Sequence, residues 1–171
     1  MIFHPVTTEI DNLSEQVDIV VDSIIKSNLK YIVICPNNDM GSDKIFKSYD
    51  RFTYMTNIKV FESIDHYDFL TLLKNARFII GNSSCGILEA PCYGKPAVNI
   101  GSRQYGRSRD RRILNCDCNE KDILKNIEWA NRTVFDPNGD ADGHCADRFI
   151  EVLSKDGFWG IGKQKKFNLC T

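Results

Sequence analysis

The residues best suited to chemistry in this sequence lie between positions 79 and 91. An apolar run there leads into Gly-Asn-Ser-Ser-Cys-Gly and then into a pattern of helical period. Ligands of open α/β sheets bind outside the carboxyl ends of the strands, where the free N–H groups of a following helix attract anions. We therefore predict that this turn and the hydroxyls of Ser83 and Ser84 bind a diphosphate. Glu89 follows about one and a half helical turns later and can accept hydrogen bonds from a sugar hydroxyl. An ordinary serine-capped helix is the alternative.

Arginine is concentrated in the loop after a second apolar run, where five arginines occur between positions 103 and 112. The planar guanidinium group binds phosphate oxygens in pairs. A loop at the carboxyl edge of the sheet would place several of these groups over the same anion site. A charged loop that only aids solubility is the alternative. We favour phosphate binding because this loop adjoins the predicted anion-binding turn in such a fold.

His4 ends the first apolar run of the chain and is followed by Pro-Val-Thr-Thr-Glu. An imidazole at that place can bond a phosphate or transfer a proton near neutral pH. A lone histidine at a strand end is more often structural, so His4 is a candidate only together with the two segments above. His66 and His144 lack comparable neighbours, and we predict that they are structural or surface residues.

The elements that must position these residues follow from the alternation of short apolar runs with stretches of helical period. This alternation predicts an α/β fold with a Rossmann-like, mainly parallel sheet and helices on both faces. Strands are expected at Met1–Pro5, Tyr31–Cys35, Ile58–Phe61, Arg77–Ile80, Ala97–Ile100 and Ile113–Cys116. Helices are expected at Asn12–Ser27, Asp43–Tyr54, Tyr67–Asn75 (capped by Asp65), Ser83–Tyr93, Glu120–Trp129 and Ala141–Ser154.

Length and composition limit the classes of protein. With 171 residues, the chain is long enough for one well-packed domain, 1–171, and too short for two. Because it opens on an apolar run, we expect this domain to be half of a longer protein. A net charge of -1 argues against nucleic acid or an anionic membrane as the main partner.

The sequence has no secretory segment and no apolar run long enough to cross a bilayer. The seven cysteines lack the paired spacing of a zinc site, so we expect no metal and a reduced, cytoplasmic protein. No other cofactor is expected, because arginines and a helix terminus can carry the charge of a diphosphate.

Three segments occur in a recognisable order: His-Pro-Val-Thr-Thr-Glu at 4–9, Gly-Asn-Ser-Ser-Cys-Gly-Ile-Leu-Glu-Ala-Pro at 81–91, and Val-Asn-Ile-Gly-Ser-Arg-Gln-Tyr-Gly-Arg at 98–107. Together they resemble the C-terminal domain of the UDP-N-acetylglucosamine 2-epimerases. The resemblance is greater to the hydrolysing branch, which feeds sialic acid and related nonulosonic acid synthesis, than to the non-hydrolysing branch. Any one segment would be weak evidence, whereas the joint pattern is specific.

This resemblance implies one half of a glycosyltransferase-B-type fold, with the active site in the cleft between two Rossmann-like halves. The C-terminal half of such an enzyme holds UDP. By the same resemblance Ser83, Ser84 and Gly86 contact the diphosphate. Arg103 and Arg107 line the phosphate side.

The resemblance also implies that Glu89 binds the ribose hydroxyls, that Phe61 positions the uracil, and that His4 is a catalytic residue at the cleft edge. The implied reaction is proton abstraction at C2 with anti elimination of UDP, giving a 2-acetamidoglucal that adds water to become N-acetylmannosamine. The acid and base come mostly from the N-terminal domain of the same enzyme, so this chain alone is expected to be inactive. The expected partners are UDP or a UDP-N-acetylhexosamine and that N-terminal domain, with a homodimer as a further option.

Two other functions fit parts of the pattern. The nucleotide half of a glycosyltransferase would carry a Glu-x7-Glu motif, but no acidic residue stands seven or eight positions before Glu89, where Gly81 and Asn82 lie. A non-catalytic UDP-sugar-binding module would keep the same turn and arginines, and the sequence leaves it open.

Overall fold

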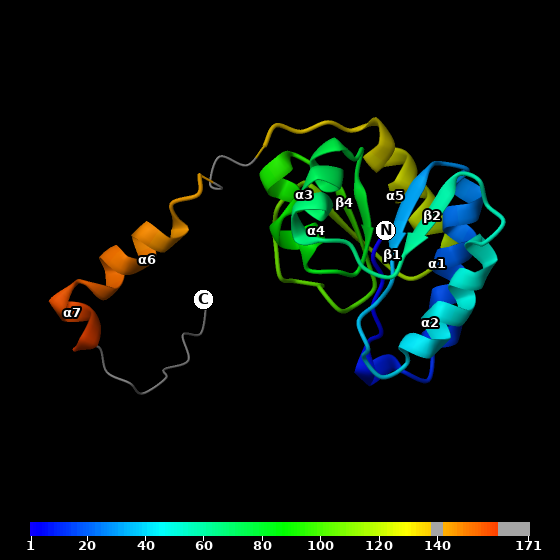
Figure 1. Ribbon diagram of the computed structural model, residues 1–171, viewed down its shortest axis with the longest axis horizontal. Helices are drawn as coiled ribbons and strands as arrows, with labels where there is room; N and C mark the ends of the chain where they lie inside the picture. The colour runs from blue at the N-terminus through cyan, green and yellow to red at the C-terminus, as the bar shows by residue number, and fades with distance from the viewer. Residues whose placement is uncertain (138–141, 161–171) are drawn as a thin grey trace. The chain divides into compact units, whose positions relative to one another are not determined.

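The structure is a computed structural model that describes residues 1–137 and 142–160 (Figure 1). Contacts group the chain into two compact units, Met1–Asn138 and Gly139–Thr171, and each is described by itself. Two such units can belong to one domain, so the single domain over 1–171 stays a prediction. None of the helices in the described residues is long and apolar enough to cross a membrane.

The first unit is built on parallel strands. They are β1 (Tyr31–Ile34), β2 (Ile58–Phe61), β3 (Ile79–Gly81), β4 (Ala97–Ile100) and β5 (Ile113–Cys116). β1 pairs with β2, and β4 lies between β3 and β5, all in parallel. The bounds predicted for β2, β4 and β5 are confirmed.

The opening segment, residues 1–4, connects the two groups of strands. Ile2 forms parallel bridges to Ile34 and to Gly81, and its N–H donates to the Ile80 carbonyl at 3.0 Å. The spatial order is therefore β2, β1, opening segment, β3, β4, β5, which is the order of a doubly wound nucleotide-binding sheet. The predicted strand over Met1–Pro5 is shorter than expected, because a side chain takes the next ladder position and Pro5 has no N–H.

Helices cover both faces of this sheet, as predicted. In the first unit they are α1 (Leu13–Ser27), α2 (Ser42–Tyr49), α3 (His66–Asn75), α4 (Cys85–Leu88) and α5 (Glu120–Arg132), with 3-10 turns η1 (Thr7–Glu9), η2 (Asp50–Phe52) and η3 (Ala90–Tyr93). Figure 1 shows α1 and α2 on one side of the sheet and α3 and α4 on the other. The second unit contains α6 (Cys145–Leu153) and α7 (Asp156–Trp159). Ala141, the predicted start of a helix, lies outside the described residues.

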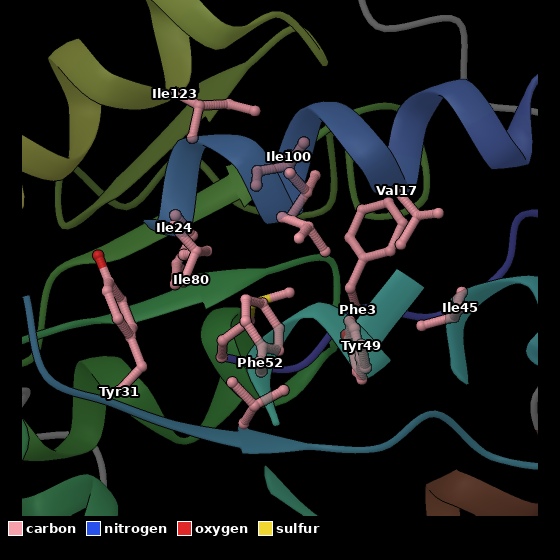
Figure 2. Close-up of a cluster of buried hydrophobic side chains, with 14 of the residues drawn as sticks. Phe3, Val17, Ile24, Tyr31, Ile45, Tyr49, Phe52, Ile80, Ile100 and Ile123 are labelled. Atoms are coloured by element: carbon pink, nitrogen blue, oxygen red, sulfur yellow. The ribbon is translucent and has the colours of Figure 1, made fainter. Parts of the chain in front are cut away.

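Alternating side chains of the strands enter two different cores. Ile80 and Val98 pack with α1 and α5 in one cluster, whereas Ile79 and Ala97 pack with α3 and α4 in another. Figure 2 shows part of the first cluster, where Ile24 of α1 lies above the sheet. Burial of each such isoleucine or valine side chain contributes about 1.5–3 kcal/mol, so the two cores stabilise the sheet beneath its loops.

Local signals explain two of these helix ends. The side chain of Asp65 accepts a hydrogen bond from the Tyr67 N–H at 2.9 Å, which confirms the predicted cap of α3. The helix predicted over Ser83–Tyr93 is instead divided into α4 and η3, because Pro91 cannot donate the hydrogen bond that a continuous helix needs. The helix predicted over Asp43–Tyr54 likewise becomes the shorter α2 and η2.

Candidate functional site

The candidate site lies at the carboxyl edge of the sheet, where the opening segment and β3 are neighbours. The chain turns to β1 after the opening segment and to β4 after β3, on opposite sides of this point. In doubly wound sheets the crevice at such a point receives the ligand. The fold therefore brings His4 and the Ser83–Ser84 turn to the same edge.

Asn82 joins these two segments directly. Its Oδ1 accepts a hydrogen bond from the His4 N–H at 2.7 Å, and its Nδ2 donates to the His4 carbonyl at 2.8 Å. The side-chain amide thus takes the place of one more ladder residue beyond Gly81. Only 1% of Asn82 is exposed, so these two hydrogen bonds are shielded from water.

The loop after β4 closes on the same residue. The Asn82 carbonyl accepts hydrogen bonds from Arg103 Nη1 at 3.0 Å and from Gln104 Nε2 at 3.2 Å. Arg107 Nη1 in turn donates to Gln104 Oε1 at 2.6 Å. Arg103 is therefore held beside the Ser83–Ser84 turn directly, and Arg107 is held there through Gln104, a buried glutamine that the sequence did not reveal.

The other arginines of this loop do not join that cluster. Arg112 forms an ion pair with Asp110 at 2.7 Å, and the guanidinium groups of Arg111 and Arg112 lie 5.7 and 6.0 Å from the centre of the Phe135 ring. Arg109 is exposed. Two of the five arginines therefore lie at the Ser83–Ser84 turn, whereas the neighbouring aspartate and aromatic ring bind two others.

The Ser83–Ser84 turn keeps polar groups available. Ser84 precedes α4 in a helical conformation and makes no side-chain cap hydrogen bond. Within the described residues, the backbone N–H groups of Ser84 and Cys85 have no acceptor. A four-residue helix adds little dipole, so the amides and hydroxyls, rather than the predicted helix dipole, are the groups available to an anion at this turn.

Two glycines of this segment have different structural roles. Gly81 has φ +135°, and a Cβ there would lie 1.8 Å from the Ile2 carbonyl oxygen, so only glycine permits the approach of the opening segment to β3. A Cβ on Gly86 would lie 3.5 Å from the Ala97 Cβ and 3.7 Å from Ile79 Cγ2, which are ordinary contacts. Gly86 thus faces the sheet, and its contact with a diphosphate stays a prediction.

Buried polar atoms without a partner occur at two of the predicted site residues, His4 Nδ1 and Glu89 Oε2. Such atoms are rare in folded proteins, and a ligand is one way to satisfy them. In the part of the chain that the structure describes, Tyr49, Asn99 and Arg112 also carry one each. The unpaired atom of His4 differs because His4 bonds to Asn82, which also bonds to Arg103, and Glu89 follows the turn with the free amides by one helical turn.

The His4 ring is held in its neutral form. Burial lowers the pKa of His4 below its usual 6.5, and the positive charge of Arg103 lowers it further, against a smaller opposing effect of Asp39. A neutral imidazole has one donor and one acceptor nitrogen. His4 can therefore offer a hydrogen bond to a ligand at pH 7 without adding charge.

Glu9 connects the segment after His4 to two neighbouring parts of the chain. Its carboxylate accepts hydrogen bonds from the Ser102 hydroxyl and, at 2.8 Å, from the Gln16 side chain. These two bonds lower the pKa of Glu9. The segment after His4 is thereby fixed to the loop after β4, on the same edge of the sheet.

Phe61 lies farther from this cluster. It ends β2, which is separated from the opening segment by β1, and 40% of its surface is exposed. The structure places it at the same carboxyl edge, and its role with a uracil stays a prediction.

A separate, mostly apolar pocket of about 620 Å³ lies beside α3 and the amino ends of β1 and β3. Among the residues described, no group of three or more His, Cys, Asp or Glu side chains is placed to hold a metal ion.

The sequence of this chain is similar to those of known proteins. A family model described as UDP-N-acetylglucosamine 2-epimerase matches residues 1–154. The chain is 35% identical over 175 residues to a UDP-N-acetylglucosamine 2-epimerase of Neisseria meningitidis, covering 96% of this chain and 45% of that protein. It is 28% identical over 155 residues to the UDP-N,N'-diacetylbacillosamine 2-epimerase (hydrolyzing) of Legionella pneumophila, covering 90% and 41%. The chain thus spans less than half the length of these relatives.

The fold also matches a solved structure. The UDP-GlcNAc 2-epimerase of Methanocaldococcus jannaschii, in complex with UDP-GlcNAc and UDP, superposes with a TM-score of 0.68 at 18% identity. The match covers 89% of this chain and 44% of that one. At this identity the likeness establishes the fold.

Proposed function

The chain belongs to the UDP-N-acetylglucosamine 2-epimerase family, and on that premise we propose that residues 1–171 form the UDP-binding domain of a hydrolysing epimerase. The complete enzyme converts UDP-N-acetylglucosamine to N-acetylmannosamine and UDP, for sialic or nonulosonic acid synthesis in the cytoplasm. An N-terminal domain of the same enzyme carries the carboxylates that act as acid and base. This chain alone therefore binds UDP but does not convert UDP-N-acetylglucosamine.

The observation that carries the proposal is the convergence of anion-binding groups at the carboxyl edge. Arg103 and Arg107 are tied to the turn that presents the free amides and the hydroxyls of Ser83 and Ser84. Two fixed positive charges and neutral donors together suit a diphosphate. Because the protein supplies this charge, the site needs no metal to hold UDP.

The same groups suit the chemistry of elimination. A base on the other domain removes the proton at C2, the C1–O bond breaks, and its electron pair leaves with the β-phosphate of UDP. Charge then builds on the leaving phosphate, where preorganised arginine and amide donors stabilise it most. Water adds to the resulting glucal to give N-acetylmannosamine.

The remaining predicted residues have supporting roles. His4, neutral and buried at the end of the opening segment, donates a hydrogen bond near the diphosphate and the reacting sugar. Glu89 Oε2, which lacks a partner, accepts from the ribose hydroxyls. Phe61 packs against the uracil at the end of β2.

Calorimetric titration of the chain with UDP, UMP and ADP tests this function. We expect saturable binding of UDP, at least about tenfold weaker binding of UMP, which lacks the second phosphate, and weaker binding of ADP, which has the wrong base. Equal affinity for UDP and ADP, or none for UDP, would contradict the proposal. Incubation with UDP-N-acetylglucosamine should yield no N-acetylmannosamine by NMR, and its appearance would show that the chain is active alone.

A further inference from the structure

The proposed function assigns Asn82 no contact with UDP, although the residue lies at the centre of the candidate site. Three segments far apart in the sequence meet on it. Its side chain bonds His4, which is 78 residues away, and its carbonyl bonds Arg103 and Gln104, which are 21 and 22 residues away. The residue is 1% exposed, and both polar ends of its amide are satisfied.

This arrangement fixes the position of His4 relative to Arg103, and both are residues proposed to contact the ligand. Asn82 holds the His4 backbone from one side and so keeps the residue that carries the imidazole beside the turn. It holds Arg103 from the other side, through its own carbonyl. Both residues bond to Asn82, and the positive charge of Arg103 lowers the pKa of His4.

We propose that Asn82 is a positioning residue, whose side-chain amide fixes the His4 ring relative to the Arg103 guanidinium so that both approach one diphosphate. This inference rests on the proposed function for its ligand, whereas the fixed relation between His4 and Arg103 can be measured without any ligand. Asn82 itself contacts neither the nucleotide nor the sugar. It acts through the two residues that do.

A purely structural role is the alternative, and the chain offers a matched control for it. Asn99 is 3% exposed and pairs in register with Gly81 in the neighbouring strand. Its Nδ2 donates to Asn115 Oδ1 at 2.6 Å, so it makes no bond to His4 or Arg103. Asn99→Ala therefore removes a buried amide at the same edge without breaking the proposed connection.

The first test follows the pKa of His4 by NMR in the absence of ligand, with exposed His66 as an internal reference. Arg103→Ala should raise the pKa of His4 in the unsubstituted chain, because the Arg103 charge lowers it. In an Asn82→Ala background, Arg103→Ala should no longer raise the pKa of His4. In an Asn99→Ala background, Arg103→Ala should raise this pKa as it does in the unsubstituted chain. If Arg103→Ala raises the pKa of His4 equally with and without the Asn82 side chain, the proposal is wrong.

The second test repeats this design with UDP binding. His4→Ala should weaken UDP binding about tenfold, the equivalent of one hydrogen bond, in the unsubstituted chain and in Asn99→Ala. In Asn82→Ala, which itself binds UDP about tenfold more weakly, His4→Ala should have less than about a twofold further effect, because residues that act as a unit are not additive. Independent, additive losses would overturn the positioning role.

Two outcomes need separate variants or controls. If Asn82→Ala does not fold by circular dichroism, Asn82→Ser removes the same amide while keeping a polar atom, and the same cycles apply. If the unsubstituted chain binds no UDP, the proposed function fails, while the titration of His4 still decides whether Asn82 fixes it beside Arg103.

Discussion

Replacing Gly81 with alanine is expected to separate the opening segment from β3 and so to disturb the edge on which the candidate site is built. Gly81 has φ +135°, and a Cβ would stand 1.8 Å from the carbonyl oxygen of Ile2 and 2.6 Å from its carbonyl carbon. The clash is with backbone, which cannot rotate away as a side chain could. The opening segment must therefore move as a whole.

The size of the effect follows from what that movement breaks. An alanine at such a φ costs about 1–3 kcal/mol. Moving the segment lengthens the bonds from the Ile2 N–H to the Ile80 carbonyl and from the Asn82 N–H to the Ile2 carbonyl, now 3.0 and 3.1 Å. Each contributes about 1 kcal/mol. The free energy of unfolding should fall by about 3–5 kcal/mol, and the Tm by roughly 10 °C.

Urea unfolding followed by circular dichroism measures this change, and Gly86→Ala is the matched control. At Gly86 the new methyl group would make only ordinary contacts with Ala97 and Ile79, so its free energy of unfolding should change by less than about 1 kcal/mol. A Gly81→Ala variant as stable as Gly86→Ala would refute the close approach of the opening segment to β3.

Three further predictions concern the site itself. Ser84→Asp should leave the fold intact, because aspartate is accepted before a helix, and should lower UDP affinity at least about a hundredfold by charge repulsion, as titration would show. Arg103→Ala should weaken UDP binding and flatten its dependence on salt, whereas exposed Arg109→Ala in the same loop should do neither. The pKa of His4 is lower in the folded chain than the usual 6.5, so the unfolded chain binds the extra proton and the free energy of unfolding should fall as the pH drops below about 6.5. Urea unfolding at pH 7 and pH 5.5 should show a smaller fall in His4→Gln, and equal falls would contradict the buried, neutral ring.

The sequence predicted most of the sheet because its strands are short apolar runs with clear limits. The predicted bounds of β4 and β5 equal the observed ones, since all of β4 is buried and each run is followed by polar or small residues. The opening strand and the helix after Ser84 were predicted too long. The Asn82 side chain and Pro5 end the opening strand, and Pro91 ends the helix. None of these residues changes the apolar pattern.

The meeting of His4 with the Ser83–Ser84 turn could also be predicted, because carboxyl ends of parallel strands share one edge. Asn82 and Gln104 could not. Each is a single polar residue in a loop, and its partners are up to 78 residues away, so no local pattern marks it. That Arg112 does not join Arg103 and Arg107 could have been predicted from Asp110, which stands two residues before Arg112 and binds it.

The most direct test of this account is a crystal structure of the chain with UDP. We expect phosphate oxygens about 3 Å from the Ser84 N–H and the Arg103 guanidinium, with the ribose beside Glu89. UDP bound elsewhere, for example in the apolar pocket beside α3, or a diphosphate that contacts neither Ser84 nor Arg103, would contradict it.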